Sequence, residues 1–203
     1  VSASEDGSIK VWDLRRGVEL QHFAVRPQPV RDCTIREEYL LSVTDTGIVR
    51  LDNHRAANSL AGHRERVTAL AIADDLIFSS GRDQTLNITQ ASTNEKQLSL
   101  PLDLLPCALE VTPQYIFLGS DQGVLQCLDR QTQRLRWEAT AHQARLNFIC
   151  ALDDKQIISG SADGLIALWN MVSGARLSAV AVGSANVRCG VGYPQERVMI
   201  GTQ

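Results

Sequence analysis

One short turn motif recurs five times along this 203-residue chain at nearly constant spacing. Each copy combines small residues with acidic or amide residues, and an apolar run follows it. The last residue of the motif, a glycine in four of the five copies, falls at positions 7, 47, 84, 123 and 164, in steps of 40, 37, 39 and 41. A period of this length predicts a repeat architecture, whose units bury their faces against one another.

The last full repeat indicates what one unit contains. Residues 147–152, 156–160, 165–169 and 175–180 are short apolar runs, and polar or glycine-containing turns separate them. Four short strands with no room for a helix predict an antiparallel meander. Such a sheet cannot bury both faces alone, so we expect radial stacking as in an all-β propeller. The alternative is a β-sandwich of short strands, which the fixed period and the recurrent turn disfavour.

Several residues resemble the WD-repeat (WD40-type) β-propeller family: the pair Gly62-His63, then Ser79 and Asp83, and the pair Trp12-Asp13. The resemblance covers the whole chain. In that family a His before the first strand, a Ser or Thr in the second strand, an Asp in the turn and a Trp in the third strand form a buried tetrad. Carried over by register, the resemblance implies a structural tetrad of His142, Ser159, Asp163 and Trp169 in the last full repeat, with His63, Ser79 and Asp83 in the third and Ser2, Asp6 and Trp12 in the first.

The other repeats depart from the family pattern. Thr89 stands in the Trp position of the third repeat, and the second keeps Ser42 but has Thr46 in the Asp position. The fourth has no tetrad, and its residues 119–125 and 135–137 resemble the repeats of quinoprotein-type propellers. A quinoprotein-like propeller is therefore an alternative.

The two ends of the chain repeat the same strand segment. Residues 1–5 match 158–162, and residues 199–203 match the same five positions. Because propellers of this family usually close with seven blades, we expect about five four-stranded antiparallel blades from a larger ring, cut within a blade at both ends. We expect one domain, 1–203, with repeat units at about 1–25, 26–61, 62–100, 101–140 and 141–182 and a partial unit at 183–203.

The third repeat contains the three residue types of a hydrolytic triad in His63, Ser79 and Asp83. A catalytic triad occurs once in an enzyme, however, whereas His142, Ser159 and Asp163 repeat nearly the same spacing in another unit, with 21 residues from His to Asp instead of 20. Repetition favours a buried hydrogen-bond network over catalysis. We therefore expect no catalytic residue and no enzyme activity.

Cofactor and metal motifs are not found in the sequence. It has no phosphate-binding glycine motif and no pair of cysteines at zinc-ligand spacing. Cys33, Cys150 and Cys189 align with Leu70 and Leu109, which predicts a small apolar core position. Five cysteines, an odd number, favour thiols in a reducing, intracellular compartment, and no apolar run is long enough to cross a membrane.

Arginine supplies 17 of the 20 basic residues of the chain, whose net charge is −3. In a propeller, the loop before each first strand and the turn between the second and third strands share one end. A mixed-charge face with excess arginine suits an acidic or phosphorylated peptide; ordinary solvated surface and RNA binding are alternatives. The loops contribute Arg26, Arg31, Arg64, Arg66, Arg145 and Arg188, and the turns contribute Glu5, Asp45, Arg82 and Asp121.

The resemblance implies a scaffold for protein–protein interaction, with other proteins as partners and with nucleic acid and membrane unlikely. One alternative is a substrate-recruiting segment of a larger multidomain enzyme, such as a ligase or a kinase. The other is the quinoprotein-like propeller.

Overall fold

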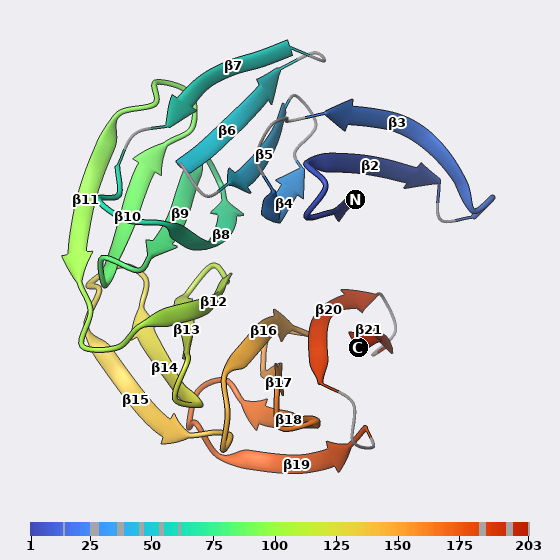
Figure 1. Ribbon diagram of the computed structural model, residues 1–203. Helices are drawn as coiled ribbons and strands as arrows, with labels where there is room; N and C mark the ends of the chain where they lie inside the picture. Colours follow the sequence, from blue (N-terminus) through green and yellow to red (C-terminus); the bar gives the residue numbers. More distant parts are fainter. Residues whose placement is uncertain are drawn as a thin grey trace. The chain divides into compact units, whose positions relative to one another are not determined.

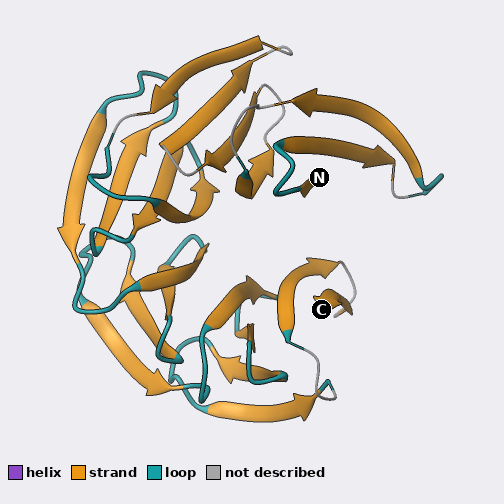
Figure 2. Cartoon of the chain, in the orientation of Figure 1, coloured by secondary structure: helices purple, strands orange, loops and turns teal. Residues whose placement is uncertain are grey.

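The computed structural model describes residues 1–13, 15–24, 29–35, 39–44, 47–52, 55–60, 62–182, 186–193 and 197–202. Of these, only the backbone is described for residues 31, 32, 35, 39, 49–52, 55–60, 191–193, 197–200 and 202. Every regular element in the described residues is a β-strand (Figure 2). No helix in this part of the chain is long and apolar enough to cross a bilayer. The chain divides into two compact units, Val1–Leu102 and Asp103–Gln203.

The first unit contains three antiparallel sheets in which strands that are consecutive in sequence pair side by side (Figure 1). One sheet has three strands and the other two have four. The strands are β1 (Ser2–Ala3), β2 (Ser8–Asp13) and β3 (Val18–Ala24); β4 (Val30–Ile35), β5 (Tyr39–Thr44), β6 (Gly47–Asp52) and β7 (Arg55–Leu60); β8 (Val67–Ala73), β9 (Leu76–Gly81), β10 (Thr85–Gln90) and β11 (Lys96–Pro101).

The second unit repeats this meander in two four-stranded sheets and adds one strand pair. Its strands are β12 (Pro106–Val111), β13 (Tyr115–Ser120), β14 (Val124–Asp129) and β15 (Leu135–Thr140); β16 (Leu146–Ala151), β17 (Gln156–Ser161), β18 (Leu165–Asn170) and β19 (Arg176–Ala181); β20 (Val187–Tyr193) and β21 (Arg197–Thr202).

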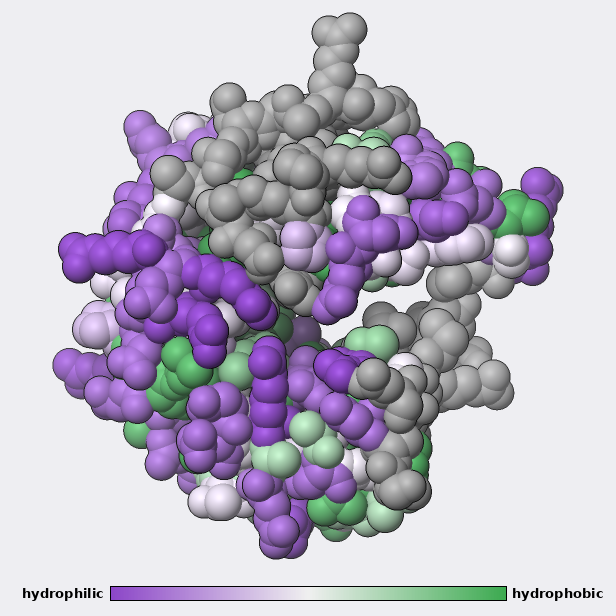
Figure 3. Space-filling view, in the orientation of Figure 1, coloured by the Kyte–Doolittle hydropathy of each residue, from purple (hydrophilic) through white to green (hydrophobic). Residues whose placement is uncertain are grey.

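Blades within each unit meet through their first strands, as propeller blades do. In the second unit β12 contacts β16, and β16 contacts β20; in the first unit β4 contacts β8. Apolar side chains of the first and second strands are buried between neighbouring sheets: Leu146 and Phe117 lie in one such cluster, and Val67 and Leu41 in another. The outer strands are mostly exposed, and hydrophilic side chains cover most of the described surface in view in Figure 3.

The recurrent turn motif joins the second strand of a blade to the third. Its last residue adopts a left-handed backbone at Gly7, Gly123 and Gly164, with φ of 81°, 79° and 80°, whereas φ is 144° at Gly47. Gln84 takes the same conformation with φ of 55°, although a side chain disfavours it. The turn geometry therefore explains why glycine recurs at this position and why the motif marks the repeat.

The first strands share an irregularity at their second residue. The pairing with the second strand shifts between Val30 and Asp32 in β4 and at the same place in β8, β12, β16 and β20. Such a bulge redirects the side chain of the extra residue. The residues at this position are Arg31, Thr68, Cys107, Asn147 and Arg188.

The prediction of an all-β fold of four-stranded antiparallel propeller blades is confirmed. The predicted strands agree with the structure to within one or two residues. The total number of blades in a larger ring and the domain boundaries remain predictions.

The alignment of the last full repeat was wrong by one residue. Leu70 pairs with Ser79, whereas Ile149 pairs with Ser159, so the connection between the first two strands is one residue longer there. Asp153 accounts for the added residue, because its Oδ1 accepts the backbone N–H groups of Lys155 and Gln156, both at 2.7 Å, and holds a wider turn.

The predicted shared cysteine position is wrong as a result. Cys33 pairs with Ser42, which is the register of Leu70, but Cys150 lies one position later and Cys189 one position earlier. Cys189 is exposed and Cys33 is half-buried. The fully buried thiols are instead those of Cys107 and Cys127, and burial raises the pKa of Cys127 to about 12.

Candidate functional site at the loop end of the blades

In the third and the last full repeat, the loop before the first strand meets the turn between the second and third strands, and we call this region of a blade the loop end. Backbone hydrogen bonds join the two segments. The N–H of Arg82 donates to the carbonyl of Arg66 at 2.8 Å, and the N–H of Ala162 donates to that of Arg145 at 2.9 Å. The expected pairing of these two segments is therefore present in both units.

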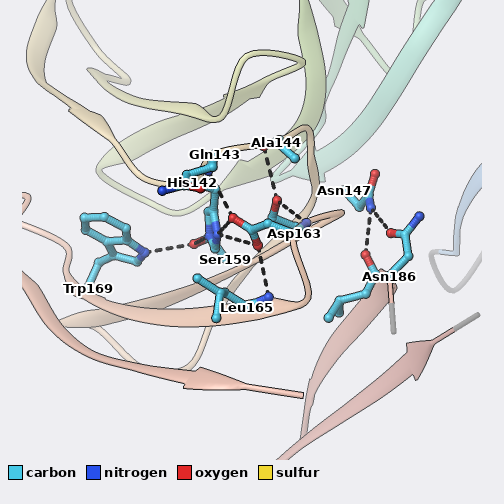
Figure 4. Close-up of polar contacts among 11 residues, drawn as sticks. His142, Gln143, Ala144, Asn147, Ser159, Asp163, Leu165, Trp169 and Asn186 are labelled. Carbon is cyan, nitrogen blue, oxygen red and sulfur yellow. Dashed lines mark hydrogen bonds and ion pairs between the residues drawn. The ribbon is translucent and has the colours of Figure 1, made fainter. Parts of the chain in front are cut away.

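Four side chains of the last full repeat form one continuous hydrogen-bond network (Figure 4). His142 Nε2 lies 2.8 Å from Ser159 Oγ, and its Nδ1 lies 3.2 Å from an oxygen of Asp163. Trp169 Nε1 lies 2.9 Å from the same Ser159 hydroxyl. Asp163 also accepts the backbone N–H groups of Gln143 at 3.0 Å and Leu165 at 2.9 Å, which ties the loop before β16 to the β17–β18 turn.

The direction of each hydrogen bond follows from the chemistry of Trp169 and Asp163, the groups at the two ends of the network. The Trp169 indole can only donate, and the ionised Asp163 carboxylate can only accept. Ser159 therefore accepts from Trp169 and donates to His142 Nε2, while the Nδ1–H of His142 donates to Asp163. This arrangement needs a neutral imidazole with its proton on Nδ1.

Burial and charge keep both ionisable groups in these states. Desolvation lowers the pKa of His142, and the nearby Asp163 opposes this shift only in part. For Asp163 desolvation acts to raise the pKa, but hydrogen bonds led by the N–H groups of Leu165 and Gln143 outweigh it, so the pKa is lowered. The pair therefore consists of a neutral His142 and an ionised Asp163 near neutral pH.

The third repeat contains the same network without the tryptophan. His63 Nε2 lies 2.9 Å from Ser79 Oγ, and its Nδ1 lies 3.0 Å from Asp83 Oδ1. Asp83 also accepts the backbone N–H of Arg64 at 2.8 Å and the hydroxyl of Thr85 at 2.9 Å. These bonds fix the loop before β8 against the β9–β10 turn.

Asn87 has a positioning role that was not predicted from the sequence. Its Nδ2 donates to the carbonyl of Gly62 at 2.8 Å, and its Oδ1 accepts the Ser99 hydroxyl at 2.6 Å. Asn87 is fully buried in β10. It thus connects the third strand to the loop before the first strand in the repeat where Thr89 replaces tryptophan. An asparagine within an apolar strand is the signal that points to it.

The first repeat differs from the expected buried tetrad. Trp12 Nε1 donates to Ser2 Oγ at 2.9 Å, as Trp169 does to Ser159, but Trp12 is 37% exposed. Asp6 is also exposed, and its Oδ1 accepts the N–H of Ser8 at 2.8 Å. The second repeat retains Ser42 in a buried position.

The triad-like distances do not lead to an open reaction site. Ser159 has no exposed surface, and its hydroxyl already contacts both His142 and Trp169. A nucleophile needs a neighbouring space for the carbonyl that it attacks. In the described residues, no group of three or more His, Cys, Asp or Glu side chains could hold a metal ion.

The predicted partner-binding residues fall into two groups. Arg64 and Arg82 are exposed and Arg66 is half-buried at the loop end of the first unit, while Arg145 is exposed and Asp121 half-buried in the second. Arg31 and Arg188 were expected in loops, but they lie inside β4 and β20 at the bulge position. Arg188 is exposed, and only the backbone of Arg31 is described; Arg26 and Asp45 lie outside the described residues.

The bulge position also makes contacts between neighbouring blades. Asn147 Nδ2 donates to Asn186 Oδ1 at 3.0 Å and to the carbonyl of Val187 at 2.7 Å (Figure 4). Asn147 comes from β16, whereas Asn186 precedes β20. This connection could not be predicted from the sequence because it joins residues about 40 positions apart on different repeats.

Comparison with protein families finds a match in two segments of the chain. The family model described as WD domain, G-beta repeat, matches residues 1–13 and 133–170. The propeller blades of the structure are consistent with that family. The second matched segment includes all four members of the His142–Trp169 network. WD-repeat propellers generally serve as protein-interaction scaffolds and generally have no catalytic activity.

Proposed function

We propose that this WD-repeat chain is a protein–protein interaction scaffold that binds acidic or phosphorylated peptide segments of its partners at the loop end. The observation that carries the proposal is that hydrogen bonds hold the backbones of Arg64 and Arg82 at the same β9–β10 turn. The N–H of Arg64 donates to Asp83 Oδ2, and the N–H of Arg82, the residue before Asp83, donates to the carbonyl of Arg66.

Both arginine side chains are exposed on backbone segments that are already held in place. Guanidinium groups bind phosphate and carboxylate through two parallel hydrogen bonds, which favours them over lysine at such sites. A fixed backbone also reduces the entropy lost when a peptide binds. In the second unit, Arg145 is exposed two residues after Gln143, whose backbone N–H donates to the Asp163 carboxylate.

The test is a binding assay with the full chain and a panel of fluorescent peptides. Acidic and phosphothreonine-containing peptides are compared with counterparts in which glutamine and threonine replace the charged residues. Binding is measured by fluorescence anisotropy. We expect the charged peptides to bind and the Arg64→Glu/Arg82→Glu double variant to bind them at least about tenfold more weakly.

A matched control is the Arg134→Glu/Arg176→Glu double variant, which makes the same charge change at exposed positions beside and within the outer strands. It should retain affinity to within about twofold. The proposal is overturned if no charged peptide binds, if the neutral peptides bind equally well, or if the two double variants lose the same affinity.

A further inference from the structure

A pocket of about 370 Å³ opens in the second unit, where the strands β12 and β16 end. These strand ends lie opposite the loop end, which is where the first strands begin. The volume falls within the range of small-ligand pockets. The residues that line the pocket come from β12 and the β12–β13 turn, from the end of β16 and the turn after it, and from the residue after β18: 110–114, Ala151, Asp153, Asp154 and Met171.

Hydrogen bonds hold the walls of this pocket without a ligand. Thr112 Oγ1 accepts the N–H of Tyr115 at 3.1 Å, and Asp153 Oδ1 closes the turn after β16. The N–H of Met171 donates to the carbonyl of Lys155 at 2.7 Å, and the carbonyl of Met171 accepts from Trp137 Nε1 at 3.0 Å. The pocket is therefore preformed between two neighbouring blades.

Glu110 places an acidic group where the other repeats have none. The register of the first two strands aligns it with Thr34, Ala71 and Cys150. Burial raises the pKa of Glu110 to about 7, and a backbone hydrogen bond from Ala151 offsets only part of that shift. Packing at this position requires no carboxyl group, as the three uncharged residues at the same position demonstrate.

The lining of the pocket is acidic and apolar. Its carboxyl groups are those of Glu110, Asp153 and Asp154, and none of its described lining residues is basic. Two cations lie nearby: Arg130 Nη1 donates to the carbonyl of Thr112 at 3.4 Å, and Lys155 is exposed. Desolvation and the Ala151 hydrogen bond are the two causes of the Glu110 shift, and neither cation contributes to it.

We propose that this pocket binds a cationic side chain, arginine or lysine, from a partner polypeptide. The apolar side chains of Val111, Pro113 and Met171 suit the methylene stem of such a residue, and the carboxyl groups suit its charged end. A bound metal ion is the poorer match, because the described residues include no group of three or more ligand side chains close enough together.

Proton linkage gives the site a characteristic pH dependence. A cation stabilises the ionised carboxylate and not the protonated acid. Since the pKa of Glu110 in the free chain is about 7, protonation competes with the cation at lower pH. Affinity for a cationic side chain should therefore rise about tenfold between about pH 6 and pH 8, as the ionised fraction increases.

The test is a nuclear magnetic resonance titration of the full chain with the capped tripeptide Gly-Arg-Gly. The same tripeptide with citrulline replacing arginine has nearly the same shape without the charge. We expect the arginine peptide to shift amide signals of residues 110–114, 151–154 and 171 in a saturable way. The citrulline peptide should bind at least about fivefold more weakly.

Glu110→Gln removes the carboxylate with little change of volume and should weaken arginine binding at least about fivefold. Glu95→Gln makes the same change at an exposed turn residue outside the pocket and should leave binding unchanged. Equal binding of both peptides, undiminished binding by Glu110→Gln, or no saturable shift would overturn the proposal. The pH series with the unmutated chain tests it even if Glu110→Gln fails to fold, since affinity that does not rise with pH would also overturn it.

Discussion

The indole N–H of Trp169 lies 2.9 Å from Ser159 Oγ, and the same hydroxyl lies 2.8 Å from His142 Nε2. One serine side chain thus connects the third strand of a blade to the loop before its first strand. Through His142 the connection continues to Asp163 and to the turn that forms part of the loop end. Core packing and the shape of the candidate binding surface are therefore linked through buried hydrogen bonds.

Replacing Trp169 with Phe should lower the free energy of unfolding by about 1–2 kcal/mol, because the buried Ser159 hydroxyl loses a donor while most of the ring packing remains. The matched control is Trp12→Phe, which removes a hydrogen bond of the same length at an exposed site. Water can replace that bond, so the control should cost less than about 0.5 kcal/mol. Urea unfolding of the full chain measures both, and equal losses would contradict the difference in burial.

The contribution of His142 to stability should depend on pH. Its folded-state pKa is lowered from the ordinary value of 6.5, so the unfolded chain takes up the proton more readily. The stabilisation by neutral His142 is present above pH 6.5 and declines as the pH falls below it. His142→Gln should therefore destabilise the chain by about 1–3 kcal/mol at neutral pH and by less near pH 5. A constant difference between the two proteins across this range would contradict the prediction.

Much of the blade could be predicted from the sequence because its signals are local and repeated. The turn motif marks a backbone position with positive φ, and the runs on either side are the strands that this turn joins. The spacing from His63 to Asp83 recurs with one residue more from His142 to Asp163, and in both repeats the His, Ser and Asp side chains lie within hydrogen-bond distance. The one-residue shift in the last repeat was not predicted because it depends on the backbone hydrogen bonds that the Asp153 side chain accepts.

Features that join different repeats could not be predicted in this way. The Glu110 pocket requires the end of β12, the turn after β16 and Met171 to come together, and no local pattern specifies that contact. Asn147 likewise contacts Asn186 only because β16 and β20 lie side by side. Arg188 was predicted to lie in a loop, because a bulge in a strand leaves no clear pattern in the sequence.

The positive φ that Gln84 and Gly123 share predicts opposite effects of substitution at these two equivalent positions. Gln84→Gly should raise the free energy of unfolding by about 0.5–1 kcal/mol, since glycine adopts the positive φ of 55° without strain. Gly123→Ala should lower it by at least about 2 kcal/mol, because the added Cβ would contact the backbone carbonyl of His142. Thermal unfolding of the two variants checks the prediction, and a stabilising Gly123→Ala would contradict it.

Glu110 should cost stability at alkaline pH, in contrast to His142. Its folded-state pKa of about 7 lies above the ordinary value of 4.5, so its contribution favours folding below pH 4.5 and is lost as the pH rises through 7. Glu110→Gln should therefore be more stable than the unmutated chain by about 1–2 kcal/mol near pH 8, with little difference near pH 5. We expect Glu95→Gln, at an exposed turn, to follow the unmutated chain at both pH values. Urea unfolding at the two pH values measures these differences. The prediction is contradicted if Glu110→Gln, relative to the unmutated chain, is less stable at pH 8 than at pH 5. That result would show that the pocket stabilises the carboxylate.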